Sequence, residues 1–498
     1  MAVSAAGTTS TGLVAQLTAM RTELADLEKK LGTGKQADTY GGLGRERNVD
    51  IAFRQKLGQV QSYQETITLV DLRLSIFSEV LTGLSDLQHD TKSIINPNEY
   101  IVQADGKTTA QTAAEITLRE VIGLLNTDVA GRYLMAGREV DEKPVENFDT
   151  IFKGTGTHAG LTQVIDERRQ ADLGAGGMGR LALSQVLDVV TLAEDVAGSP
   201  FGFKIDGVVN TLSNVTITGP AGAPMTMDMD FTGQPAPGES IRIQLSMPDG
   251  TITEIELEAD VVGSEPGTFA IGATSSDTAI NFNAALDTAL QEAVATELRA
   301  ASAVAAGNDF FDTFQGNPPQ RVDGPPFDTA IALRDGTADT VAWYVGDNSA
   351  DSPRNGIAAR IDSAMTVGYG VRANEEGLRS MVQTLAVFTS ETYAPDDAAD
   401  ELRYQEMAER ARLALDVPNN VQSVEQIHLE IAAVHKTVDD ARQRHEATEG
   451  TLISLVEEIE GVNMQEVAAK MLTLQTRMQA TYEATSLLLQ MSLVNYLR

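Results

Sequence analysis

Cysteine is absent from this sequence of 498 residues, and tryptophan occurs once, at Trp343. The lack of cysteine excludes a disulfide framework, a cysteine nucleophile and thiolate metal sites. No apolar run approaches the roughly 18 residues that a membrane-spanning helix needs. Aromatic residues make up only 5% of the chain, which is little for an enzyme built around a small-molecule pocket. These absences argue against a membrane span and against most kinds of catalysis.

Basic side chains are also scarce. The chain has 37 Lys and Arg residues against 71 Asp and Glu residues, so its formal net charge is −34. Such an acidic surface repels phosphate backbones and anionic lipids, so we expect neither nucleic acid nor a membrane as a partner. Residues 1–12 are small and polar and lack the cationic and apolar stretches of a secretory signal peptide. The chain is therefore expected to be cytoplasmic, or exported by a route that leaves its N-terminus uncut.

What the chain does contain is a set of heptad seams at its two ends. Near the N-terminus, apolar residues follow a 4-3-4-3-4 spacing, which is typical of a coiled-coil helix. Gly32 and Gly34 end this segment, and a second helix is predicted over about 44–90, before Asn96-Pro97-Asn98. The first seam consists of Leu13, Leu17, Met20, Leu24, Leu27 and Leu31, and the second includes Val60, Ile67, Leu74, Phe77 and Leu81.

The C-terminal end shows the same pattern. One seam begins at Val424 and runs through His445 to Val462, and the final residues stay apolar to the terminus. A single apolar stripe usually belongs to an ordinary core, but four stripes at both ends predict helices that pair with each other, with other chains, or with both. The first C-terminal seam includes Ile427, Ile431, Val438 and Leu455; the last includes Val467, Met471, Leu474, Met478, Leu489, Leu493 and Tyr496.

The middle of the chain has a different composition. Residues 197–275 are rich in Gly, Thr and Pro, and apolar residues alternate on both sides of Pro248-Asp249-Gly250, which predicts a β-hairpin. Residues 278–306 are predicted to be helical, with Phe282 and Leu286 on one face. Residues 201–300 carry 3 basic and 14 acidic side chains, a net charge of −11. We therefore predict a small α+β domain with an acidic, solvated surface.

No constellation of chemically active residues stands out. His428 and His435 share a helix face but lack a third metal ligand at the required spacing. The glycines of residues 154–160 do not fit a dinucleotide loop, because the third one comes a residue late and no βαβ pattern surrounds them. Asp228 and Asp230 could contact Ca²⁺, but alternating outward residues of a strand explain them better. We expect no enzyme activity, cofactor or metal.

Four stretches of the end segments resemble the bacterial flagellin and hook-associated protein 3 family. Residues 27–44 resemble the bend between its first two helices, and Asn126 with 131–137 (GRYLMAG) resembles the element that leads into a β-hairpin. Residues 370–388 are similar to the start of its inner C-terminal helix, and 467–498 to its terminal helix. Together the matches cover roughly 1–165 and 340–498, and they leave the middle unspecified.

The resemblance implies a fold that is mainly α at both ends, with long N- and C-terminal helices packed together and an inserted α+β outer domain. Residues 1–40 with 460–498 would form the inner helices of a tube, disordered in the monomer. Residues 41–170 with 340–459 would form a second helical layer with a β-hairpin, and 171–339 a variable surface domain. The first and last seams would then be the assembly interface, and the two seams between them an intramolecular contact.

The function implied is that of a flagellin, a structural subunit exported unfolded through the flagellar export apparatus, with an export chaperone at the C-terminal helix. It would assemble outside the cell into a helical homo-oligomer, next to hook-associated and cap proteins. The cysteine-free composition fits that location. The alternative within the family is the hook-filament junction protein, which the GRYLMAG element and the SLVNYL ending favour. A middle domain of about 165 residues favours the filament subunit.

Two hypotheses from other classes remain open. A secreted adhesin or glycan-binding module would carry its function in residues 197–335 and would bind through the isolated middle domain. A cytoplasmic coiled-coil scaffold is the other, although it does not explain why apolar seams reach the last residues of the chain.

Overall fold

The structure, a computed structural model, describes residues 3–416 and 421–496; within α1 and α11 it describes the side chains of residues 12–33, 464–487 and 490. The chain divides into two compact units. The first consists of Met1–Asp71, Arg360–Thr366 and Lys436–Arg498, and the second of Leu72–Ala359 and Val367–His435. The two longest helices each contribute to both units, so each unit is described separately.

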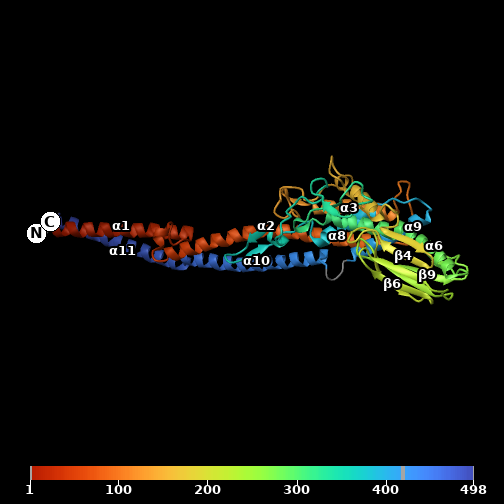
Figure 1. Cartoon of the computed structure of the whole chain (residues 1–498). Helices are drawn as coiled ribbons and strands as arrows, with labels where there is room; N and C mark the ends of the chain where they lie inside the picture. Colours follow the sequence, from red (N-terminus) through yellow and green to blue (C-terminus); the bar gives the residue numbers. More distant parts are fainter. Residues whose placement is uncertain (1–2, 417–420, 497–498) are drawn as a thin grey trace. The chain divides into compact units, whose positions relative to one another are not determined.

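The described part of the first unit contains four α-helical segments and one short 3-10 helix. Helix α1 (Val3–Thr33) lies beside α11 (Met464–Tyr496) along its length (Figure 1). The N-terminal part of α2 (Arg47–Ile94) pairs with the C-terminal part of α10 (Val424–Glu460), and a short 3-10 helix, Tyr40–Leu43, precedes α2. Gly34, at φ +69°, ends α1 in the left-handed conformation that favours glycine. Helix α2 ends before Asn96-Pro97, as predicted, because proline cannot continue a helix.

The helical part of the second unit surrounds a separate core. Helix α3 (Thr109–Leu125) packs on α8 (Glu376–Thr389), which also packs on α9 (Ala398–Leu415). A small hairpin of β1 (Asp128–Val129) and β2 (Arg132–Tyr133) follows α3 in the GRYLMAG region. The remaining elements are α4 (Phe148–Lys153), α5 (Leu161–Leu173), the pair β11 (Gln320–Val322) and β12 (Leu333–Asp335), the pair β13 (Ala358–Arg360) and β14 (Thr366–Gly368), and 3-10 turns at Phe314–Gly316 and Pro353–Asn355.

The β-rich middle of the chain consists of two four-stranded sheets and a helix, all within the second unit. Only the pairing of β10 with β9 is parallel. One sheet has the order β3-β4-β7-β6, from β3 (Leu181–Val186), β4 (Val189–Glu194), β7 (Thr226–Phe231) and β6 (Val215–Ala221). The other has the order β10-β9-β8-β5, from β10 (Thr268–Ala270), β9 (Ile252–Asp260), β8 (Ser240–Ser246) and β5 (Lys204–Asn210).

The predicted hairpin and helix of this middle region are both confirmed. Ile243 of β8 lies opposite Ile255 of β9. Both are buried, because successive side chains of a strand point to opposite faces of the sheet. The helix extends beyond the predicted range, as α6 (Ser275–Ala293), a π-helical turn (Val294–Leu298) and α7 (Arg299–Phe311). The long helices at both ends and the β-rich middle confirm the predicted fold class at this level.

Candidate assembly site at the chain ends

The first and last predicted seams meet within one chain. Leu27 of α1 forms a buried cluster with Val467, Leu474 and Met478 of α11. Because both sequences repeat every 3.5 residues, the seam stays on the facing side of each helix. Half-buried side chains extend the cluster on either side: Met20, Leu24, Leu31, Val462 and Met471.

This seam is only partly covered. Of the six predicted residues of α1, Leu27 alone is buried, at 8% exposure, whereas Leu13, Leu17 and the other three are half-buried. Outside the seam, Leu472 and Leu487 of α11 are 64% and 61% exposed. Two paired helices cannot enclose their apolar side chains from all sides, so part of the apolar surface stays open to solvent. The side chains of Leu489, Leu493 and Tyr496 lie outside those that the structure describes.

Polar contacts fix the register of the two helices. The Arg21 guanidinium donates two hydrogen bonds to the Tyr482 hydroxyl, from Nε at 3.0 Å and Nη2 at 2.8 Å. The same guanidinium lies 5.8 Å from the centre of the Tyr482 ring, within reach of a cation–π interaction. The heptad pattern in the sequence does not predict this pair, because that pattern consists of apolar positions only.

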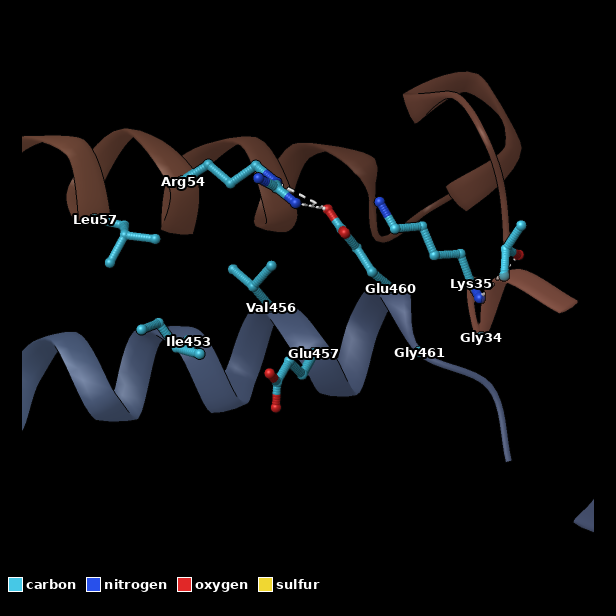
Figure 2. Close-up of a pocket in the computed structure, with 10 residues that line it drawn as sticks. Gly34, Lys35, Arg54, Leu57, Ile453, Val456, Glu457, Glu460 and Gly461 are labelled. Carbon is cyan, nitrogen blue, oxygen red and sulfur yellow. Dashed lines mark hydrogen bonds and ion pairs between the residues drawn. The ribbon is translucent and has the colours of Figure 1, made fainter. Parts of the chain in front are cut away.

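The turns at the bases of α1 and α11 are bound to each other through their backbones. Gln36 N donates to Glu460 O at 2.7 Å, and Val462 N donates to Gly34 O at 3.1 Å. Figure 2 shows the cavity beside this junction, of about 390 Å³, with Leu57 and Val456 on its apolar side. The predicted boundaries at residues 40 and 460 thus fall close to two turns that hydrogen-bond each other.

A charged cluster closes the polar side of this cavity. Arg54 Nε donates to Glu460 Oε1 at 2.8 Å, and the same Nε lies 3.6 Å from Asp50 Oδ2 (Figure 2 shows Arg54 and Glu460). Asp50 is fully buried, and neither carboxylate oxygen accepts a hydrogen bond from the described residues. Burial and the nearby Glu460 charge raise the pKa of Asp50, because both disfavour its ionised form.

The two intermediate seams are buried more completely. In the first unit, Val60, Ile67 and Val438 are at most 3% exposed. In the second unit, five seam residues are fully buried: Leu74, Phe77, Leu81, Ile427 and Ile431. Leu455 is half-buried, and the neighbouring Val456 is buried. The helical repeat of 3.6 residues shifts the buried position by one along a long helix.

His445 occupies its predicted place in the seam, where its contacts are a backbone carbonyl and an aromatic ring. It is 6% exposed, its Nε2 lies 2.8 Å from Ile361 O, and its ring stacks on Tyr63 with the centroids 5.5 Å apart. His428 Nε2 lies 2.8 Å from Ser78 Oγ. Neither contact gathers the ligands of a metal, and no group of three or more His, Asp and Glu suited to a metal occurs among the described residues.

The other candidate motifs have structural roles. Residues 154–160 form the predicted turn, in which Thr155 and His158 exchange backbone hydrogen bonds at 3.0 Å. Asp228 and Asp230 alternate with the buried Met227, Met229 and Phe231 along β7, as predicted for a strand. Within residues 3–416 and 421–496, no helix is long and apolar enough to cross a bilayer.

The sequence matches no known family model and no curated protein. Among solved structures, it is similar to the crystal structure of flagellar hook-associated protein 3 from Legionella pneumophila. The identity is 11%, the match covers 85% of this chain and 98% of that chain, and the TM-score is 0.27.

Proposed function

We propose that this chain is a structural subunit of the bacterial flagellar filament, a flagellin, that self-assembles into a helical tube for motility. The observation that carries the proposal is the partly covered seam between α1 and α11. A seam that a single chain half-buries is completed when neighbouring copies supply the remaining contacts. The resemblance of residues 27–44 and 467–498 to the flagellin and hook-associated protein 3 family supports the same function.

The energetics favour folding of the ends on assembly. A heptad helix of about 20 residues is marginal in water without a partner. Full burial of the six Leu and Met side chains of the α1 seam on assembly would contribute on the order of 10 kcal/mol, at about 1.5–3 kcal/mol each, before the cost of ordering the chain. Residues 1–40 and 460–498 would therefore stay disordered in the monomer and become helical when a neighbouring copy arrives. A repeated contact that does not close on itself produces a filament rather than a ring.

Export and location follow from this proposal. A chain with disordered ends suits passage in unfolded form through the flagellar export apparatus, with an export chaperone bound at the C-terminal helix. Outside the cell, it would be incorporated next to hook-associated and cap proteins. The net charge of −34 would keep subunits soluble and apart before assembly. In this proposal the chain has no catalytic role, and residues 171–339 form a surface domain of the filament.

A second candidate is the hook-filament junction protein. The hairpin of β1 and β2, with register Asp128↔Tyr133 and Val129↔Arg132, lies in the GRYLMAG element that favours it. A junction protein forms one short layer and needs hook and filament partners to define its place. It would therefore share the assembly residues of α1 and α11 but would not form long filaments alone.

Negative-stain microscopy of the purified full-length chain, after seeding and salt-induced polymerisation, tests the proposal. We expect long tubes of uniform width. Short rings under the same conditions would favour the junction protein instead. Monomers under every condition, together with glycan binding by residues 197–335 alone, would favour an adhesin and contradict a filament role.

A further inference from the structure

A second site lies far along the chain from the assembly residues, within the second unit. A cavity of about 270 Å³ opens between α5 and the π-helical turn that leads into α7. Its walls are apolar at Leu173, Val294 and Leu298, and two guanidinium groups, Arg169 and Arg299, also line it. A concave apolar pocket with a few convergent polar groups is the usual form of a small-molecule site.

Several buried polar groups converge behind this cavity without hydrogen bonds. Glu391 is 2% exposed and contacts Arg169 Nη2, and its Oε2 lies 3.8 Å from Arg299 Nε. Within the described part of the chain, Arg169 Nε, Arg403 Nε and the buried Tyr393 hydroxyl have no hydrogen-bond partner. Such groups are rarely left unsatisfied in a folded protein, so their concentration at one place calls for a functional explanation.

The residues that line the cavity include two cations and no anion, and carboxylates outside the lining balance their formal charge. Arg169 and Arg299 share the single buried carboxylate of Glu391, while Arg403 is paired with Asp400 at 2.8 Å. Asp166 also lies 3.8 Å from Arg169 Nη1, but its side chain is 61% exposed, so water screens it. Burial, followed by the nearby charge of Arg299, lowers the pKa of Arg169. Of the two guanidinium groups that line the cavity, Arg169 thus pairs closely with Glu391, whereas the Arg299 Nε stays 3.8 Å from that carboxylate.

The local backbone also departs from regular structure at this place. Residues Val294–Leu298 form a π-helical turn between α6 and α7, and three of them, Val294, Ala295 and Leu298, line the cavity. Single π-helical turns inside longer helices occur frequently at functional sites, because the extra residue redirects neighbouring side chains. Here the turn immediately precedes Arg299, and we take it to set the position of that guanidinium.

From these observations we propose that the cavity binds a small amphipathic carboxylate, with its carboxylate on Arg169 and Arg299 and an aliphatic tail against Leu173, Val294 and Leu298. A guanidinium fork matches the geometry of a carboxylate, and a charge-assisted pair of this kind is strong in a desolvated site. The apolar walls cannot replace the hydrogen bonds that water makes to a strongly hydrated anion such as phosphate. This site is independent of the proposed assembly function and is accessible in the unassembled chain.

Isothermal titration calorimetry of the unassembled full-length chain tests the proposal, with octanoate as the probe. We expect saturable binding at one site per chain, and no comparable binding of inorganic phosphate or of 1-octanol. Phosphate binding as tight as that of octanoate would overturn the tail contacts, and octanol binding as tight would overturn the arginine contacts. An absence of octanoate binding would overturn the site altogether.

Two variants locate the site. The Arg299 side chain is 42% exposed, so Arg299→Gln is expected to fold normally and to weaken octanoate binding by about tenfold or more, the value of a charged hydrogen bond. Ala295→Phe is expected to fill the mouth and abolish binding without changing any charge. Arg242→Gln is the matched control, because its side chain is 51% exposed and it pairs with Glu256 on another face. Binding that survives both site variants, or that is lost equally in the control, would overturn the assignment.

Discussion

Asp50 and Arg54 lie one helical turn apart in α2, and the buried Asp50 carboxylate faces the Arg54 guanidinium at 3.6 Å without receiving a hydrogen bond from it. The guanidinium instead donates to Glu460 of α10, from Nε at 2.8 Å. Arg54 thus serves two carboxylates and hydrogen-bonds only one of them. Asp50 is left with a desolvated carboxylate at the point where the bases of α1 and α11 are joined.

We predict that Asp50→Asn stabilises the helices of the first unit at neutral pH. Because the pKa of Asp50 is raised in the folded chain, stability falls as the pH rises from the ordinary pKa of an aspartate to the raised one. Above the raised pKa, the destabilisation caused by the ionised Asp50 carboxylate is constant, and an uncharged amide removes it. A gain on the order of 1 kcal/mol is expected, because the substitution removes the buried charge but leaves a buried polar group in its place. Thermal unfolding followed by circular dichroism, at pH 4 and pH 7, measures it.

Glu466→Gln is the control for this prediction. Glu466 is 61% exposed and pairs with Lys470 at 2.7 Å on the surface of α11. An exposed pair of this type contributes little, so the unfolding temperature of the variant should match that of the wild-type chain at both pH values. A gain for Asp50→Asn that is as large at pH 4 as at pH 7 would show that ionisation of Asp50 is not its cause.

The sequence predicts the helical ends well because their signal is periodic. Heptad spacing identified apolar seams that contain Leu27, Val467 and Leu474, and the structure brings these three residues, more than 400 positions apart, into one cluster. The β8–β9 hairpin could be predicted equally well, because apolar and polar residues alternate on both sides of its turn. Strands β3 and β4, over residues 181–194, were missed because no Pro- or Gly-marked turn of the usual kind separates them: Leu187 takes φ +54° at their tip.

Polar clusters were beyond the reach of these patterns. Asp50 and Glu460, like Arg169 and Glu391, come from segments distant in sequence, and neither pair belongs to a periodic motif. Their proximity depends on how helices pack in three dimensions, which spacing within one helix does not encode. Near Leu455, the drift between the 3.5-residue and 3.6-residue repeats buries the neighbouring Val456, while Leu455 itself is half-buried.

A double substitution in the seam of α1 tests the assembly site directly. We predict that Leu24→Asp with Leu27→Asp abolishes filament formation, since two charges would be buried against Val467 and Leu474 in the α1–α11 cluster. The thermal unfolding of the second unit should stay unchanged. Leu187→Asp is the matched control, because Leu187 is an apolar residue with 76% exposure at a turn of the outer sheet. Failure of the control to polymerise would mean that added negative charge alone prevents assembly.

A core substitution in the β-rich middle should lower the stability of that region without preventing filament formation. Phe282 of α6 is fully buried and packs on Phe231 and Phe269, with ring centroids 5.3 and 5.2 Å away. Phe282→Ala is expected to lower the free energy of unfolding of this region by about 3–5 kcal/mol, as is usual for loss of a buried Phe. Filaments should still form at temperatures below the new transition. Calorimetry followed by microscopy of the same sample checks both outcomes. Loss of filaments from a folded variant would place assembly contacts in the middle region.

Removal of residues 463–498 is the most decisive change, because it deletes α11 and leaves the second unit intact. The truncated chain should remain soluble, should unfold at the same temperature as the full-length monomer, and should form no filaments under seeding conditions. In the full-length chain, circular dichroism should gain helical signal on polymerisation, up to the 31 residues of α1 and the 33 of α11. The truncated chain should show no such gain, because α1 has lost the surface on which it folds. Filaments from the truncated chain would show that α11 is not needed for assembly. An unchanged helical signal when the full-length chain polymerises would show that its ends are already folded in the monomer.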